Sequence, residues 1–401
     1  MSNRHKKLFS DLNRRDVAIL VTILVLVTGF IYLYSAKYYL LNRWVYIAQA
    51  PFAERTITCS EKAPDFMHDT IRNMIYEQKS MSNQLVFRES NGHLHHCESG
   101  WEDGFRGTSP INVDSQYRYA SVSKVLTSAI ILNLINQGKL ELNTKLVDIL
   151  KIPPANDKRI NDITIEMLLQ HSAGFDRFKT YTPMLTMDVK PWCPNQLEEL
   201  ATTQLDFTPN NQFSYSNVGY CLLGAIAEKV SGKDFKALAN DLYHLQSRNI
   251  DFVAEGYLPN EIKYDFRYED FYGESYTTHF DFKDSLYAVG GLAGSAKSMV
   301  LLTADMLKEK PYNVVSRNNT PCNINVLEGC YGYGMLPYEQ TGKNFILYGK
   351  SGFFPGVNTD IFVDSNGGIL AAYRASSTPN YKIKDQLKLQ IYQSLLDFYH
   401  I

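Results

Sequence analysis

The chain has 401 residues, of which 45% are hydrophobic and 20% are charged, and its 40 basic and 42 acidic residues give a formal net charge of -2. This balance excludes the strongly basic surface of a nucleic-acid-binding protein, so we expect no nucleic-acid partner. The length suffices for one large domain or for two lobes that share a cleft.

The N-terminal segment has the length and composition of a membrane span. Residues 17–35 carry no charge and are long enough to cross a bilayer as one helix. Aromatic residues follow where the lipid–water boundary would lie: Tyr32, Tyr34, Tyr38 and Tyr39. Basic residues are concentrated before the span: Arg4, Lys6, Lys7, Arg14 and Arg15, against Lys37 and Arg43 after it.

This charge bias predicts that residues 1–16 are a cytoplasmic tail and that the chain is a single-pass protein of the inner (cytoplasmic) membrane. Residues 36–62 would then be a tether, and residues 63–401 a periplasmic or otherwise extracytoplasmic domain. The alternative is a signal peptide cleaved after Ala48-Gln-Ala50. The apolar core is longer than that of a signal peptide, which favours the uncleaved anchor.

Six cysteines outside the cytoplasm permit disulfide bonds. Cys322 and Cys330 bracket a short loop, which favours a bridge between them. Cys59 with Cys97 is a plausible second pair. Cys221 begins an apolar helix, and we interpret it as a small buried residue.

The cluster His93, His95, His96 and Cys97 suggests metal binding, but no second group with ligand spacing supports it. An exposed arm of a hairpin is the simpler interpretation. We therefore expect no metal and no cofactor.

Hydrophobic periodicity predicts a sequence of helices and strands along the rest of the chain. The helices cover residues 64–79, 125–135, 147–150, 163–169, 197–205, 218–230, 235–245, 296–307 and 383–398. The strands cover residues 84–89, a partner that ends near Trp101, and 331–335, 344–349, 359–364 and 368–374. Hairpin turns are indicated by Asn91-Gly92 and by Asn366-Gly367-Gly368. Residues 290–295 are expected to form a tight turn.

The order of these elements predicts an α+β fold. The N- and C-terminal segments would share one antiparallel sheet flanked by helices, and the middle of the chain would form a helical lobe. Residues 251–287 show no clean period and would form an elaborated loop or short hairpins near the cleft. His171 ends a helix; a role as general base is conceivable, but packing of the loop is the preferred interpretation.

The first chemical motif is Ser121-x-x-Lys124, at the start of a helix that Gly138 ends. A spacing of three places the amine one helical turn from the hydroxyl. A serine needs a neighbouring base, and burial makes a lysine give up its charge more easily. The helix N-terminus offers free N–H groups to an oxyanion.

Two further motifs follow in the chain. Tyr215 and Asn217 form Y-x-N, in which neighbouring cations could lower the pKa of the phenol so that it relays a proton. Lys350-Ser351-Gly352 lies on a strand and could present a cation and a hydroxyl to a substrate carboxylate. The N–H of Phe353 would be a second oxyanion donor beside that of Ser121.

The three motifs, in this order, resemble the serine β-lactamase and penicillin-binding protein superfamily. Tyr215-Ser216-Asn217 points to its class C branch, with D,D-peptidase and esterase relatives. The segments that begin at Leu168, Gly290, Tyr331 and Pro355 fit as well, so the resemblance covers about residues 65–400. One departure is Pro209-Asn210 where relatives often have Pro-Gly; Asn tolerates the same left-handed backbone.

The resemblance implies that Ser121 is the nucleophile and Lys124 assists its deprotonation. Tyr215 would act as base and then as acid, while Asn217, Lys350, Ser351 and Gly352 would bind substrate. The expected function is an anchored serine hydrolase that forms an acyl-enzyme on D-Ala-containing peptidoglycan peptides. The substrate would carry a carboxylate, and β-lactams would be covalent inhibitors. Alternatives are an esterase or amidase, a β-lactamase, or a non-catalytic penicillin-binding sensor.

Overall fold

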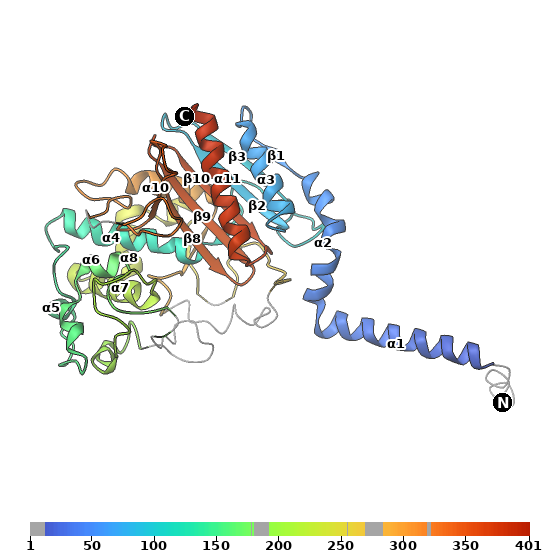
Figure 1. Cartoon of the computed structure of the whole chain (residues 1–401), viewed down its shortest axis with the longest axis horizontal. Helices are drawn as coiled ribbons and strands as arrows, with labels where there is room; N and C mark the ends of the chain where they lie inside the picture. The colour runs from blue at the N-terminus through green and yellow to red at the C-terminus, as the bar shows by residue number, and fades with distance from the viewer. Residues whose placement is uncertain (1–12, 178, 180–191, 255, 269–283, 319–321) are drawn as a thin grey trace.

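A computed structural model describes residues 13–177, 179, 192–254, 256–268, 284–318 and 322–401. Its centre is a seven-stranded antiparallel sheet in the order β1-β3-β2-β10-β9-β8-β7 (Figure 1). The strands are β1 (Thr58–Cys59), β2 (Ser82–Arg88), β3 (Leu94–Ser99), β7 (Leu336–Tyr338), β8 (Leu347–Phe354), β9 (Val357–Asp364) and β10 (Ile369–Ala375). Strands from both ends of the folded chain therefore pair with each other, as predicted, through β2 and β10.

Each face of the sheet has its own hydrophobic core, because successive strand residues point to opposite sides. Along β2, Leu85 and Phe87 pack in one core and Val86 in the other. The first core is covered by α2 (Tyr38–Glu54), α3 (Asp65–Tyr76) and α11 (Tyr381–Tyr399). The second face carries the helical lobe (Figure 1).

The helical lobe is formed by the middle of the chain, as predicted. Its α-helices are α4 (Lys124–Asn136), α5 (Leu146–Leu150), α6 (Ile165–Leu169), α7 (Asn217–Ser231), α8 (Phe235–Tyr243) and α10 (Ala296–Met306). Its 3₁₀ turns are η1 (Ala120–Ser123), η2 (Lys158–Asp162), η4 (Leu197–Thr202) and η5 (Gln246–Arg248). A three-stranded sheet joins β4 (Tyr117–Arg118), β6 (Leu292–Gly294) and β5 (Asp251–Phe252).

Four local predictions are wrong. Residues 331–335 are not a strand; the pairing with β8 begins at Leu336, because Leu336 lies opposite Gly349. Residues 290–295 are more than a turn, since Leu292–Gly294 pairs with β4 and β5. Within the helix predicted for residues 197–205, only Leu197–Thr202 is helical, and it forms the 3₁₀ turn η4 instead of an α-helix. His95, expected on an exposed arm, is buried and bonds Glu89 at 2.7 Å.

The disulfides confirm two predictions and correct one. Cys59–Cys97 joins residues that face each other on β1 and β3, and Cys322–Cys330 closes a short loop. Cys221, interpreted as a small buried residue, instead forms a disulfide with Cys193. The bridge fixes residue 193, which follows a segment outside the described residues, to helix α7.

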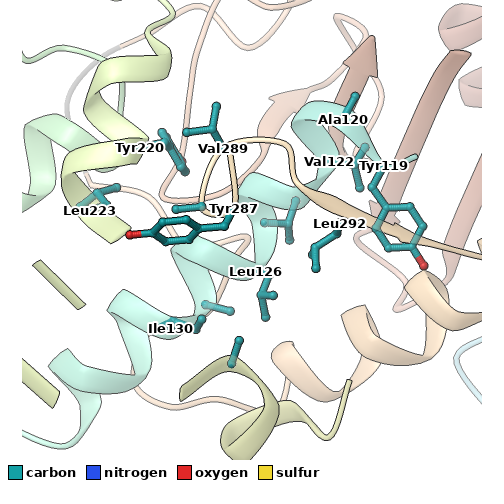
Figure 2. Close-up of a cluster of buried hydrophobic side chains, with 14 of the residues drawn as sticks. Tyr119, Ala120, Val122, Leu126, Ile130, Tyr220, Leu223, Tyr287, Val289 and Leu292 are labelled. Carbon is teal, nitrogen blue, oxygen red and sulfur yellow. The ribbon is translucent and has the colours of Figure 1, made fainter. Parts of the chain in front are cut away.

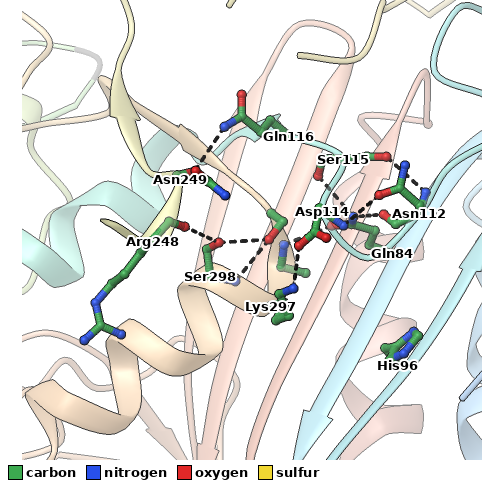
Figure 3. A network of polar contacts seen from close by, with 12 residues as sticks. Gln84, His96, Asn112, Asp114, Ser115, Gln116, Arg248, Asn249, Lys297 and Ser298 are labelled. Carbon is green, nitrogen blue, oxygen red and sulfur yellow. Dashed lines mark hydrogen bonds and ion pairs between the residues drawn. The ribbon is translucent and has the colours of Figure 1, made fainter. Parts of the chain in front are cut away.

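A polar network ties the sheet to the helical lobe (Figure 3). The side chain of Gln84 on β2 accepts from Ala296 N at 2.9 Å, at the start of α10, and donates to Ser115 O at 3.0 Å. Lys297 of α10 pairs with Asp114 (Figure 3). The loop that leads into β4 is thereby held against both layers.

The N-terminal segment forms two consecutive helices. Helix α1 (Arg14–Ala36) includes the predicted span, begins at an Asn13–Asp16 capping box, and has no buried residue. Residues 36–62, predicted to be a tether, contain helix α2, whose Tyr46, Ala50 and Ala53 are buried. The hydroxyl of Tyr46 donates to Ile75 O at 2.6 Å and to Ser80 O at 2.9 Å.

Candidate active site

The segment that carries Ser121 leaves β4 and turns sharply into α4. Ala120, directly before Ser121, has a positive φ of 48°, which is uncommon for a residue with a side chain. The hydroxyl of Thr359 on β9 donates to Tyr119 O at 2.8 Å. Ser121 was predicted to lie in the first turn of the α-helix. It lies instead in the 3₁₀ turn η1, which directly precedes α4.

Helix α4 runs through the middle of the helical lobe and is buried on nearly all sides, which matches its apolar sequence. Leu126 and Ile130 pack among side chains from α7 and from the segment around Leu292 (Figure 2). This packing fixes the position of Lys124, which begins the helix and is completely buried.

The amine of Lys124 lies against three neutral oxygen atoms. Its Nζ is 3.2 Å from Ser121 Oγ, 2.9 Å from Asn217 Oδ1 and 2.8 Å from Val289 O. Burial, and then the nearby charges of Lys350 and Arg177, hold the pKa of Lys124 well below its usual range. A neutral amine has two N–H groups for the two carbonyl oxygens and one lone pair for the proton of Ser121. The geometry is therefore that of a base beside a hydroxyl.

The Tyr215-Ser216-Asn217 segment is positioned by the start of α7. The Ser216 hydroxyl accepts from Gly219 N at 3.4 Å and so caps the helix. This cap places Asn217 at the first helical position, where its side chain accepts from Lys124. On the other side of the cap, Tyr215 Oη donates to Ser121 Oγ at 2.7 Å. Asn210, with φ 64°, has the left-handed backbone expected for it.

The sequence allowed Tyr215 to relay a proton if neighbouring cations lowered the pKa of its phenol, but in this structure burial is the dominant influence on that pKa. Burial raises the pKa of Tyr215, and this outweighs the lowering by its bond to Ser121 and by Arg177. The phenol therefore keeps its proton and acts as a hydrogen-bond donor in this state. Among the groups that contact Ser121, Lys124 is the better proton acceptor.

The ring of His171 packs against the ring of Tyr215. Its Nδ1 accepts from Ser216 N at 3.0 Å, and its ring centroid lies 4.4 Å from that of Tyr215 and 4.6 Å from that of Tyr331. Burial, and then the nearby amines of Lys350 and Lys124, hold the pKa of His171 well below its usual range, so the ring is neutral. These contacts match the packing role that the sequence favoured.

Lys350, Ser351 and Gly352 lie on β8, which packs against η1. A Cβ atom added to Gly352 would lie 2.3 Å from Tyr119 O and 3.0 Å from Ser121 N. Any side chain at this position would force β8 away from the Ser121 segment. The glycine thus allows the strand edge to approach the hydroxyl.

The backbone of Phe353 is directed toward Ser121 by the pairing of β8 with β9. Phe354 and Val357 are paired on either side of the two-residue turn between β8 and β9, which makes them a hydrogen-bonded pair. Along an antiparallel ladder, hydrogen-bonded pairs alternate with pairs that share no hydrogen bond. Phe353 pairs with Asn358 at a position without such bonds, so its N–H points away from β9, to the side of β8 where η1 packs. Ser121 N is near the start of η1, where helical N–H groups have no partner within the helix.

Two hollows meet at Ser121. The first, which we call the basic hollow, has a charged lining that comprises Arg177, Lys350, Arg374, Lys384, Lys388, Glu328 and Asp360. The second, which we call the apolar hollow, is lined in part by Leu286, Val289, Phe354 and Pro355. Ser121, Arg177, Tyr215 and Phe353 line both.

The acids of the basic hollow are already paired with bases. Asp360 bonds Arg374 and accepts from the Ser351 hydroxyl at 2.5 Å, while Glu328 lies 2.7 Å from Lys388. The excess of basic groups suits this hollow to an anionic part of a ligand.

Lys350 is the basic group of this hollow that belongs to the third motif. Its Nζ donates to Tyr331 Oη at 2.5 Å and lies 4.7 Å from the ring centroid of Tyr215. Burial lowers the pKa of Lys350 to about 7, although Glu328 opposes this change. Its charge is therefore sensitive to pH and to a bound carboxylate.

Sequence reasoning missed several residues of the site. Arg177 lies beside the ring of Tyr215 at 5.5 Å, but it follows no motif. Tyr331 was recognised only as part of a glycine-rich segment, and its contact with Lys350 depends on the tertiary fold. Lys384 and Lys388 come from α11, where their spacing of four is that of an ordinary amphipathic helix.

The site and fold agree with comparisons against known proteins. The model of the family described as "Beta-lactamase" matches residues 83–393. The chain belongs to this family. It is 52% identical to the "Probable fimbrial assembly protein FimD, serogroup H1" of Dichelobacter nodosus over 386 residues, 96% of this chain and 97% of that protein.

Two more distant matches are named for action on D-amino acid compounds. The chain is 26% identical to the D-alanyl-D-alanine-carboxypeptidase/endopeptidase AmpH of Escherichia coli K12 over 194 residues, 46% of this chain and 48% of that enzyme. The D-amino acid amidase of Ochrobactrum anthropi SV3 shares the fold, with a TM-score of 0.64, 17% identity, and coverage of 82% of this chain and 98% of that one.

Proposed function

We propose that the chain is a membrane-anchored serine hydrolase that forms an acyl-enzyme on Ser121 and acts on peptidoglycan peptides ending in D-Ala, as a D,D-carboxypeptidase or endopeptidase. The observation that carries the proposal is the position of Ser121 Oγ, 3.2 Å from the Lys124 amine and 2.7 Å from the Tyr215 hydroxyl. The basic hollow beside it would accept the carboxylate of such a peptide.

The reaction would begin with transfer of the Ser121 proton to Lys124, whose lowered pKa favours the neutral form that can accept it. Oγ then attacks the peptide carbonyl, and the N–H groups of Ser121 and Phe353 stabilise the oxyanion. Tyr215 gives its proton to the leaving amine and regains one from Lys124. Attack of water on the ester repeats these steps in reverse roles and releases the acyl group.

Substrate positioning would involve both hollows. Lys350 and Ser351 would bind the terminal carboxylate in the basic hollow, and Asn217 would donate to an amide oxygen of the substrate. The apolar hollow would take a side chain on the acyl side of the cleaved bond, because its lining includes the apolar residues Leu286, Val289 and Phe354, with Arg177 as the one charged residue among those described.

The anchor proposed for this hydrolase is helix α1. Its 23 residues would extend about 35 Å, which exceeds the bilayer core of about 30 Å. Cleavage after Ala50 would cut helix α2 and remove Tyr46, whose hydroxyl bonds two buried backbone carbonyls. This packing supports an uncleaved anchor, and similarity to a protein named for fimbrial assembly supports a place in the cell envelope.

The experiment that tests the proposal is covalent labelling of the purified full chain with a fluorescent penicillin. We expect one label on the wild type and none on Ser121→Ala. Incubation with purified muropeptides, followed by mass spectrometry, should show release of D-Ala by the wild type alone. Equal labelling of the variant would contradict the proposal.

A second candidate is an amidase or esterase acting on small D-amino-acid derivatives, which the apolar hollow favours. It predicts turnover of p-nitrophenyl esters or D-amino-acid amides without release of D-Ala from muropeptides. Stable, stoichiometric labelling with no turnover of either substrate would instead indicate a penicillin-binding sensor.

A further inference from the structure

Helix α2 is apolar on two opposite faces. One face, with Tyr46, Ala50 and Ala53, is buried against the folded domain. The residues of the opposite face recur at intervals of one, three and four along the helix, and all of them are exposed: Trp44, Ile47, Ala48 and Pro51. Trp44 is 61% and Ile47 85% exposed, values that are unusual for side chains of this size in a helix packed on a domain.

The position of α1 indicates what covers this exposed face. The chain turns at Lys37, which separates α1 from α2, and α1 then leads away from the domain (Figure 1). Because the domain lies on one side of α2, a bilayer around α1 would lie on the other side. The exposed apolar face of α2 is on that other side.

The charges around this face fit the boundary of a bilayer. The helix contains a single acid, Glu54, which is already bonded to Arg72 at 2.7 Å and to the Tyr76 hydroxyl at 2.6 Å. Two arginines, Arg55 and Arg106, lie over the ring of Phe52 at 5.6 and 5.2 Å, where lipid phosphates would lie beside an inserted aromatic ring.

We infer that α2 is an interfacial helix whose Trp44–Ile47 face is inserted among the lipids of the same membrane that α1 crosses. Tryptophan is enriched at this depth, and amphipathic helices with arginines beside the apolar face bind there. The opposite face of α2 holds the domain against the membrane surface. This inference rests on the anchor part of the proposed function.

The test is a depth measurement on the full chain, reconstituted in vesicles of phosphatidylethanolamine and phosphatidylglycerol. A nitroxide is attached to Ile47→Cys and, as the matched control, to Leu389→Cys on α11, a leucine that is 41% exposed and far along the chain from the anchor. Collision rates with oxygen and with a nickel chelate are measured for both labels. We expect the oxygen-to-nickel ratio to be several-fold higher at residue 47 than at residue 389.

Flotation of the vesicles tests the α1 anchor separately from the interfacial position of α2. If the chain floats with the lipid but the two labels give equal ratios, the interfacial helix is wrong and the anchor stands. A label at residue 47 shielded from both reagents, with spin–spin broadening, would show contact with a second copy and would also overturn the inference. A chain that does not float would contradict both the anchor and the interfacial helix.

Discussion

Lys124 is fully buried against neutral oxygen atoms, so the fold itself favours its uncharged form. Two roles are possible for such a group: it can accept the proton of Ser121, or it can supply a positive charge. Arginine separates them, because it keeps its charge in proteins and cannot take up a proton.

We therefore predict that Lys124→Arg loses acylation about as completely as Lys124→Met, by about 10²- to 10⁴-fold, the range typical of general bases. The measurement is the rate of labelling by a fluorescent penicillin. Circular dichroism provides the folding control, since a larger guanidinium must fit the same space. An arginine variant that is folded and retains most of the rate would show that charge, and not proton transfer, is what Lys124 supplies.

The lowered pKa of Lys350 leads to a prediction about how kcat/KM depends on pH. Its pKa of about 7 means that the cation is present below pH 7 in the free protein and is lost as the pH rises through 7. Binding of a carboxylate should weaken in the same direction, so kcat/KM for a carboxylate-bearing substrate should fall about tenfold per pH unit well above 7.

The methyl ester of the same substrate is the control for this pH effect, because it offers Lys350 no negative charge. Its kcat/KM should not show the fall near pH 7. Parallel profiles for acid and ester would mean that Lys350 does not recognise the carboxylate.

At the scale of elements, the site depends on the close approach of β8 to η1. Gly352→Ala would place a methyl group against Tyr119 O and Ser121 N and displace the strand that carries the Phe353 N–H. We predict a fall in acylation rate of about 10²-fold, comparable to the loss of one oxyanion donor.

Gly219→Ala is the matched control for this substitution. Gly219 lies near the site on α7, but its added Cβ would meet Leu168 only at 3.6 Å, an ordinary contact. The control should keep its activity, and its melting temperature should not fall. Equal activity of Gly352→Ala and wild type would show that the approach of β8 is not needed.

The elements also show how far sequence reasoning reaches. Helices such as α4, α7 and α11 were predicted because their apolar residues recur over many turns. Strands β4, β5 and β6 have two or three residues each, and their existence depends on partners far apart in the chain. The Cys193–Cys221 bridge was not predicted, because the two cysteines are 28 residues apart and no short loop brackets them as one brackets Cys322 and Cys330.

The residues of the candidate site divide in the same way, into those that belong to a local motif and those that only the tertiary fold brings to the site. Ser121, Lys124, Tyr215, Asn217 and Lys350 were found because each belongs to a short motif, and the structure brings them together. Arg177, Tyr331 and Lys384 enter the site only through folding. The direction of the Tyr215 pKa shift could not be derived from the motif, because burial, which a motif does not report, outweighs the effect of nearby charge.

At the scale of the whole molecule, α2 belongs to the folded domain although it precedes the predicted domain boundary. We predict that removal of residues 1–36 leaves a folded, active protein. Removal of residues 1–54 should lower the free energy of unfolding by several kcal/mol, because it uncovers the apolar surface beneath α2 and frees the carbonyls of Ile75 and Ser80.

Urea unfolding of the two truncated proteins, followed by circular dichroism, measures this difference. Tyr46→Phe in the protein that lacks residues 1–36 is an intermediate control, expected to lose about 1 to 3 kcal/mol through the unpaired carbonyls. Equal midpoints for both truncations would mean that residues 37–54 are a loose linker.

For the proposed membrane anchor, the direct junction of α1 and α2 at Lys37 limits how far from the membrane the active site can lie. A catalytic domain on a long flexible linker samples a wide range of distances from its membrane. A domain that is joined to its anchor through packed helices stays within a narrow range of distances. Under the proposed function, only cell-wall material within this narrow range of distances from the membrane would reach Ser121.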